Sequence, residues 1–145
     1  MIDRAGILSL IPHAGRMCLL DSVSHWDDAS IVCRASSHHD PANPMRERGR
    51  LDAVCGVEYA AQAIAVHGGL LAGGARPRAG YLASVRDLCW EVERLDELPG
   101  DLVIRARRLL AESSRAIYAF EINVETQRML QGRAALVLND GARSP

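Results

Sequence analysis

Residues 53–72 form a run of small and apolar side chains that constrains the fold more than any other segment of the chain. Glu58 is the one charged residue in this run, apart from whatever charge His67 carries. Asp52 is placed to cap the start of a helix, and Gly73-Gly74 is placed to end it. A helix that is apolar nearly all round is buried, and a lone carboxylate on it must find a partner or serve chemistry. The run therefore predicts a core helix with a functional acid.

Segments of strand length surround the predicted helix. A short helix at residues 3–11 and strands at 17–26 and 31–36 precede it, followed by a polar loop at 37–51. Strands at 79–92, 101–110, 116–124 and 129–138 come after it as consecutive antiparallel strands. In the third of these, Phe120, Ile122 and Val124 alternate with polar residues. This order is typical of an α+β domain.

A flat sheet would leave much of such a helix in water, whereas a curved sheet wrapped around it would bury the helix on most sides. This arrangement is the hot-dog architecture. We expect a single hot-dog domain over residues 1–145. One protomer would leave an open sheet edge, so we expect a homodimer with a continued sheet.

Composition excludes several classes of function. The 145 residues carry a formal net charge of −1, which argues against a nucleic-acid partner. Polar interruptions of the apolar run argue against a membrane span, and residues 1–4 lack the pattern of a signal peptide. The four cysteines are scattered, as in a cytoplasmic protein. Adjacent His38 and His39 lie in a polar loop without convincing metal-site geometry, so we expect no metal and no cofactor.

Two segments resemble the 3-hydroxyacyl-(acyl-carrier-protein) dehydratases of hot-dog fold. Residues 11–23, IPHAGRMCLLDSV, resemble the N-terminal P-H-x-x-P-[MF]-L-L-[VL]-D-x-V segment of that family, and residues 57–62, VEYAAQ, resemble its helix motif E-x-x-A-Q. The form G-[VI]-E-Y-x-A-Q is similar to that of the accessory dehydratase-like branch of aryl polyene-type clusters. The resemblance implies a substrate on acyl carrier protein, and a homodimer or a heterodimer with a related dehydratase.

The chain departs from the family at two positions. Counted back from Glu58, the catalytic loop histidine of the housekeeping dehydratases would fall on Pro44. The Pro-Gly that opens the helix in those enzymes is replaced by Asp52-Ala53. His38 and His39 lie too far from Glu58 in the sequence to take the place of that histidine.

The resemblance implies roles for residues of both segments. His13 would act as the base that removes the α-proton, and Glu58 as the acid for the leaving hydroxyl. Gln62, one helical turn after Glu58, could orient the carboxyl group or the hydroxyl. The backbone N–H groups of Val54, Cys55 and Gly56 would face the thioester oxygen, and Gly56 would let the substrate approach the backbone closely.

Structural roles remain open for the same residues. Glu58 could be satisfied by a backbone N–H or by Arg86, His13 could tether the N-terminal segment, and we expect His67 to be a packing residue. Exposed arginines that include Arg46, Arg48 and Arg50 could attract an acidic carrier protein. The leading function is removal of water from a 3-hydroxyacyl thioester carried by acyl carrier protein, in fatty acid or polyene-type biosynthesis. The alternatives are an acyl thioesterase of the same fold and a non-catalytic accessory subunit of a dehydratase heterodimer.

Overall fold

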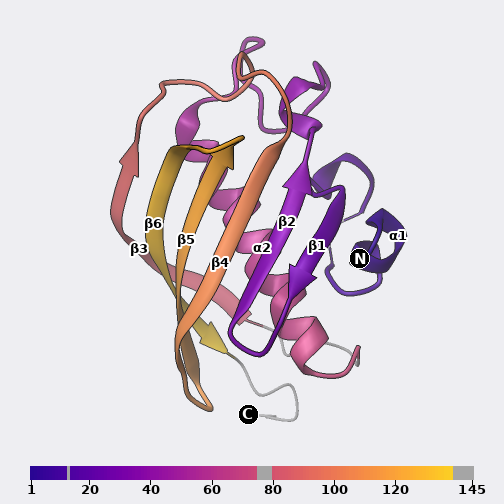
Figure 1. Cartoon of the computed structure of the whole chain (residues 1–145), viewed down its shortest axis with the longest axis vertical. Helices are drawn as coiled ribbons and strands as arrows, with labels where there is room; N and C mark the ends of the chain where they lie inside the picture. The colour runs from indigo at the N-terminus through magenta and orange to yellow at the C-terminus, as the bar shows by residue number, and fades with distance from the viewer. Residues whose placement is uncertain (13, 75–79, 139–145) are drawn as a thin grey trace.

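The computed structural model describes residues 1–12, 14–74 and 80–138. Within these residues, six strands form one antiparallel sheet in the order β1-β2-β4-β5-β6-β3. The sheet curves around the long helix α2 (Gly56–Leu71), while the short helix α1 (Arg4–Leu8) lies beyond the β1 edge (Figure 1). The strands are β1 (Ser22–Trp26), β2 (Ser30–Ala35), β3 (Gly80–Trp90), β4 (Leu102–Ala111), β5 (Arg115–Val124) and β6 (Gln127–Leu138). The predicted α+β fold and its wrapped helix are confirmed.

The sequence periodicity places the core correctly along β5. Phe120, Ile122 and Val124 are buried, whereas Glu121 and Asn123 are partly exposed on the outer face of the sheet. Short turns join β4 to β5 and β5 to β6, as the polar segments between these strands predict. Helix α2 packs mainly on β2, β4 and β5.

The first strand after the helix pairs differently from what its place in the sequence suggests. β3 pairs with β6 and not with the next strand, β4. The connection between β3 and β4 crosses the end of the sheet, where the N–H of Leu95 donates to the carbonyl of Leu51 at 2.7 Å. The N–H of Ala53 donates to the carbonyl of Glu93 at 3.0 Å. The crossing is fixed by contacts that no local pattern reveals, and β3 becomes an open edge.

The N-terminal strand is shorter than predicted. A 3₁₀ helix, η1 (Gly15–Met17), and an extended segment replace the first part of the predicted strand at 17–26, and sheet pairing starts only at Ser22. Leu19 of this extended segment hydrogen-bonds to Gln62 of α2, and Asp21 at its end donates to the carbonyl of Arg34 in β2. The bond to α2 accounts for the difference.

The start of the core helix also differs from the prediction. A 3₁₀ helix, η3 (Ala53–Cys55), comes before α2, and the Asp52 side chain makes no capping bond to it. The Asp52 carboxylate instead accepts a hydrogen bond from Arg50. At the other end, Gly73 and Gly74 have φ of 73° and 78°, and the N–H of Gly74 donates to the carbonyl of Gly69 at 3.0 Å. The predicted glycine stop is confirmed.

Helix α2 packs closely on the sheet at its first residue. A Cβ built on Gly56 would lie 2.5 Å from Leu130 Cδ2 and 3.0 Å from Ile122 Cδ1. The glycine is therefore required by contact between the helix and the sheet, and its predicted role in letting a substrate approach the backbone stays a prediction. Residues 53–71 are also long and apolar enough to cross a membrane by length and composition, with half of that window buried here.

We predict opposite stability effects for alanine at two glycines of α2. Gly56→Ala should lower the free energy of unfolding by about 1–3 kcal/mol, because the new methyl group overpacks the core against Leu130. Gly68→Ala is the matched control, since nothing lies within 4 Å of its built Cβ. It should raise stability by about 0.5–1 kcal/mol through helix propensity. Urea denaturation measures both, and equal effects would contradict the packing argument.

Candidate functional site

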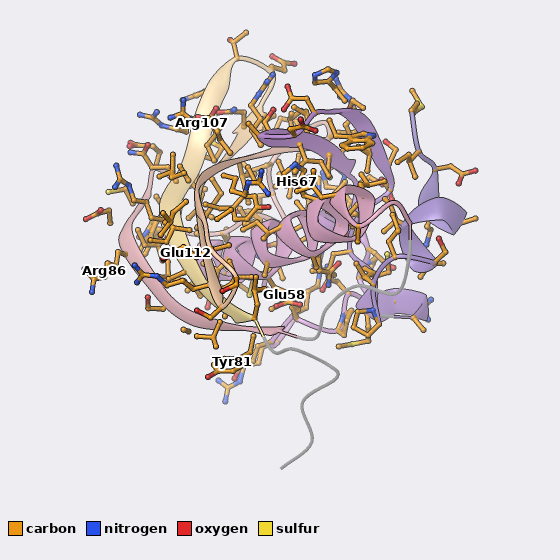
Figure 2. All side chains as sticks on the ribbon, turned by 90° about the horizontal axis from the view of Figure 1, so that it is seen from below. Glu58, His67, Tyr81, Arg86, Arg107 and Glu112 are labelled. Atoms are coloured by element: carbon orange, nitrogen blue, oxygen red, sulfur yellow. The ribbon has the colours of Figure 1, made fainter. Side chains whose placement is uncertain are left out.

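The predicted acid lies on a face of α2 that the sheet leaves partly open. Glu58 is in the first turn of the helix and is half-buried. In Figure 2 it points to the side of the helix opposite His67, which lies between the helix and the sheet. Within the described residues, a stripe along this face keeps some exposure. The open stripe of α2 consists of Val54, Glu58, Ala61, Ala65, Gly68 and Ala72.

Gln62 joins the N-terminal segment to the helix beside Glu58. Its side chain is buried, at 1% exposure. Its Oε1 accepts from the N–H of Leu19 at 2.9 Å, and its Nε2 donates to the carbonyl of Met17 at 2.8 Å. Nε2 also donates to Oε1 of Glu58 at 3.2 Å. Of its two predicted roles, the geometry favours orientation of the carboxyl group, because both ends of the amide already have protein partners.

A buried hydrogen-bond chain, which the sequence did not predict, holds the same segment from the other side. Asn43 Nδ2 donates to Tyr59 OH at 3.1 Å, and Tyr59 OH contacts Ser37 Oγ at 2.7 Å. Ser37 Oγ donates to the carbonyl of Leu19 at 2.8 Å. Because a carbonyl only accepts, the Ser37 proton points to Leu19 and Tyr59 donates to Ser37. Burial raises the pKa of Tyr59, which keeps this hydroxyl a donor. In the sequence, the only sign of this hydrogen-bond chain was Tyr59, a polar residue next to Glu58 in the apolar run.

The predicted base cannot be placed. His13 lies outside the described residues, so its pairing with Glu58 stays a prediction. The described segment that follows it, from residue 14 to Leu19, approaches α2 through the Gln62 bonds. The loop position that holds a histidine in the housekeeping enzymes is Pro44 here, between Asn43 and Met45.

The N–H groups predicted to face the thioester oxygen are largely engaged. The N–H of Cys55 donates to the carbonyl of Asp52 at 3.0 Å, and that of Gly56 donates to the carbonyl of Ala53. The reason is the 3₁₀ turn of η3, whose tighter bonds satisfy donors that an α-helix would leave free. Val54 is 52% exposed at the end of the open stripe. An oxyanion role for these residues stays a prediction.

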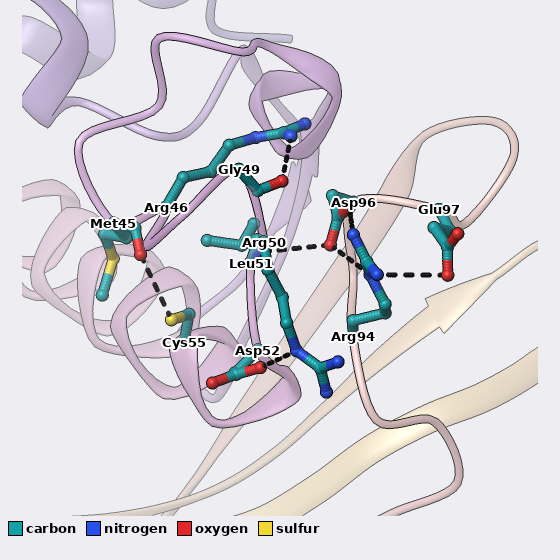
Figure 3. A network of polar contacts seen from close by, with 10 residues as sticks. All are labelled: Met45, Arg46, Gly49, Arg50, Leu51, Asp52, Cys55, Arg94, Asp96 and Glu97. Atoms are coloured by element: carbon teal, nitrogen blue, oxygen red, sulfur yellow. Dashed lines mark hydrogen bonds and ion pairs between the residues drawn. The ribbon is translucent and has the colours of Figure 1, made fainter.

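An ion-pair network fixes the chain directly before η3 (Figure 3). Asp96 accepts from the N–H of Leu51 at 3.0 Å and from the guanidinium of Arg94. The hydrogen bond from Arg94 holds the pKa of Asp96 well below its usual range. Met45 also lies against η3, where its carbonyl is 3.9 Å from the Sγ of Cys55. The start of α2 is therefore held from two loops at once.

His67 is a structural residue, as predicted. It is fully buried; Nε2 donates to the carbonyl of Asp27 at 2.8 Å, and Nδ1 accepts from Tyr118 OH at 2.6 Å. These bonds join α2 to the β1–β2 hairpin and to β5. Burial lowers the pKa of His67, so the folded protein favours the neutral ring.

His38 and His39 take part in a contact between their own loop and the β3–β4 connection. The rings of His38 and His39 lie with centroids 3.8 Å apart and tilted by 37°, and their Nε2 atoms both reach the carbonyl of Leu98, at 3.3 and 2.6 Å. In residues 1–12, 14–74 and 80–138, no three His, Cys, Asp or Glu side chains gather as a metal site would require. Arg86, considered as a partner for Glu58, is exposed on β3 and points away from the helix (Figure 2).

Two surface depressions lie away from Glu58. Two open depressions of about 640 and 670 Å³ occur on the outer face of the sheet, and both include Val32 and Arg105. Glu58 lines neither of them. They lie across the sheet from α2, so they offer no path to the acid. Neither depression therefore marks a substrate site at Glu58.

Comparisons with known proteins agree with the fold and with the sequence resemblance. The model of the ApeP-like family, described as ApeP dehydratase, matches residues 5–142. A chain of the dehydratase heterocomplex ApeI:P from Xenorhabdus doucetiae superposes with a TM-score of 0.83 at 23% identity, covering 93% of this chain and 91% of that one. No curated protein matches the chain.

Thioesterases share the fold at greater distance. One from Haemophilus influenzae gives a TM-score of 0.62 at 14% identity, covering 84% of this chain and 80% of that one. A mutant thioesterase from Pseudomonas aeruginosa gives 0.58 at 14% identity, covering 81% and 79%. At such identities the likeness shows the fold alone, and it confirms the predicted hot-dog class.

Removal of the Gln62 amide should destabilise the protein. Gln62→Leu leaves the buried N–H of Leu19 and the carbonyl of Met17 without partners, which should cost about 2–4 kcal/mol of unfolding free energy. Gln131→Leu, on the outer face of the sheet, should change stability by less than about 0.5 kcal/mol. Amide hydrogen exchange gives a local test, because the Leu19 N–H should lose protection in the Gln62 variant. Unchanged protection of the Leu19 N–H would contradict the role of Gln62 in holding the N-terminal segment.

The buried His67 predicts a pH dependence of stability. Its folded pKa lies below the ordinary value of about 6.5, so the unfolded chain takes up the proton first. The stability is fully present above about pH 6.5 and falls as the pH drops through the window below it. In His67→Gln the slope of unfolding free energy against pH in that window should decrease by up to about 1.4 kcal/mol per pH unit. An unchanged slope in chemical denaturation would contradict the assignment.

Proposed function

The chain belongs to the ApeP-like dehydratase family, and from that premise we propose that it removes water from 3-hydroxyacyl thioesters carried by acyl carrier protein. The observation that carries the proposal is the place of Glu58. It is the only acid on α2, it lies on the open stripe, and Gln62 fixes its carboxyl group at 3.2 Å. A carboxyl group held in this way, beside small side chains, can meet a substrate that lies along the helix.

Dehydration requires two proton transfers at neighbouring carbons. His13 takes the proton from the α-carbon, and the electron pair moves to form the α–β double bond. The C–O bond at the β-carbon breaks, and Glu58 delivers a proton to the departing hydroxyl, which leaves as water. The products are a 2-enoyl thioester and one water molecule. Gln62 keeps the Glu58 oxygen in place while the substrate binds.

A second hot-dog subunit would complete the site. Within the described residues, the open stripe of α2 has no cover, and β3 is an edge strand with exposed apolar side chains. Tyr81, Leu82 and Trp90 are exposed by 57%, 37% and 50%. An edge of this length in a monomer invites strand pairing. The similar structure from Xenorhabdus doucetiae is a dehydratase heterocomplex, which supports a related dehydratase as the partner, with a homodimer as the alternative.

The departure at Pro44 supports a second candidate function. If the loop histidine is needed and His13 does not replace it, the chain is an accessory subunit that shapes the tunnel of an active partner. The two candidates differ in a direct assay of the purified protein with a 3-hydroxyacyl or crotonyl thioester. Turnover by the protein alone supports the enzyme. Turnover only with the partner supports the accessory role if Glu58→Ala leaves that turnover unchanged, and supports the enzyme if Glu58→Ala abolishes it. Hydrolysis to free thiol with the 3-hydroxyl retained would instead indicate a thioesterase.

Substitutions at the two proposed groups test the catalytic assignment. Glu58→Ala and His13→Ala should each lower turnover by about 10²–10⁴-fold, the usual contribution of a general acid or base. Glu112→Gln is a matched control, because that carboxylate is exposed and paired with Arg115 at the β4–β5 turn. Circular dichroism and gel filtration should show each variant folded and in its wild-type assembly. Activity within tenfold of wild type in either active-site variant would refute the assignment.

A further inference from the structure

A tight turn before the core helix holds an arginine in an unusual backbone conformation. Glu47 and Arg50 exchange two backbone hydrogen bonds, at 2.9 and 3.0 Å, so Arg48 and Gly49 form a two-residue hairpin turn. Both turn residues have positive φ, 54° for Arg48 and 75° for Gly49. This combination is that of a type I′ turn, in which asparagine or glycine is preferred at the first position. An arginine there is strained, and strained residues gather at functional sites.

The arginines on either side of this turn have structural partners, whereas Arg48 has none among the described residues. Arg46 donates to the carbonyls of Gly49 and His38 at 2.8 and 2.9 Å, and Arg50 pairs with Asp52 (Figure 3). For the exposed Arg48 side chain, no hydrogen bond or ion pair is formed with the described residues. Its guanidinium is therefore available to a partner from outside the chain.

The turn lies at the end of α2 that carries the acid. The carbonyl of Met45, three residues before Arg48, lies against Sγ of Cys55 at 3.9 Å. Cys55 and Glu58 are three residues apart at the start of the helix, so they share one face. Asn43 reaches Tyr59 on the next residue of the helix. The loop that ends in Arg48 therefore packs at the start of α2, against residues on either side of Glu58 in the sequence.

We propose that Arg48 binds the phosphodiester of the prosthetic arm by which the carrier protein presents its acyl group. This inference rests on the proposed function, since it names the part of the substrate that this residue reads. A guanidinium matches two phosphate oxygens at once. The acyl end of the arm must reach Glu58, while its phosphate stays at the carrier surface. A cation on a rigid turn near the start of α2 suits that outer end.

The variant Arg48→Asn separates binding from folding. Asparagine suits the turn better than arginine, so the melting temperature should rise by about 1–4 °C. The dissociation constant for holo carrier protein should weaken by about 5–10-fold, while that for apo carrier protein, which lacks the arm, should not change. The measurement is isothermal titration calorimetry on the intact assembly. Arg107→Asn, on the outer face of the sheet, removes the same charge and should leave both constants unchanged.

Small substrates give a second readout. Wild-type protein should prefer a crotonyl thioester of 4′-phosphopantetheine over that of pantetheine in kcat/KM, and Arg48→Asn should abolish this preference. Equal weakening for apo and holo carrier would show that Arg48 reads the carrier surface and would overturn the inference. Equal effects of the two asparagine variants would overturn it as well. A wild-type assembly that turns over thioesters without any phosphate preference refutes the inference alone, whereas absence of both turnover and carrier binding refutes the proposed function.

Discussion

Close contact between α2 and the curved sheet is the constraint on which the rest of this structure depends. Gly56 lies where a single methyl group would collide with Leu130, so the helix starts in direct contact with β6. Gly69, near the other end, faces Leu10 more loosely, with Leu10 Cδ2 at 3.1 Å from a built Cβ. Small residues at both ends bring the helix near to its neighbours, and the sheet then covers most of its circumference. This packing leaves the open stripe, which contains Glu58, partly exposed.

Polar side chains inside such a core are stable only when their hydrogen bonds are complete. Gln62, Tyr59 and His67 satisfy this condition with partners far away in the sequence. Each of them also fastens a separate segment to α2: the N-terminal segment, the loop that contains Asn43, and the β1–β2 hairpin. The helix is thus the centre of the apolar core, and it also hydrogen-bonds to the three segments around it. This double role explains why a nearly apolar helix retains three buried polar residues.

The site of Glu58 combines rigidity on one side with openness on the other. The Gln62 amide and the network around Asp96 hold the start of the helix firmly. On the open side, the exposed β3 edge and the small residues of the stripe offer a surface to a second subunit.

Local patterns in the sequence determined the elements and the buried face of the sheet. The run at 53–72 gave the core helix, alternation in β5 gave its inward side chains, and the IPH and VEYAAQ segments gave the family. Glu58, Gln62 and His67 were each predictable because a polar residue in an apolar run needs a partner or a purpose. The pairing of β3 with β6, the 3₁₀ turn before α2, and the Asn43–Tyr59–Ser37 chain were decided only in the tertiary structure. Each depends on atoms brought together from distant segments, and no periodicity along the chain records which distant donor will meet which acceptor.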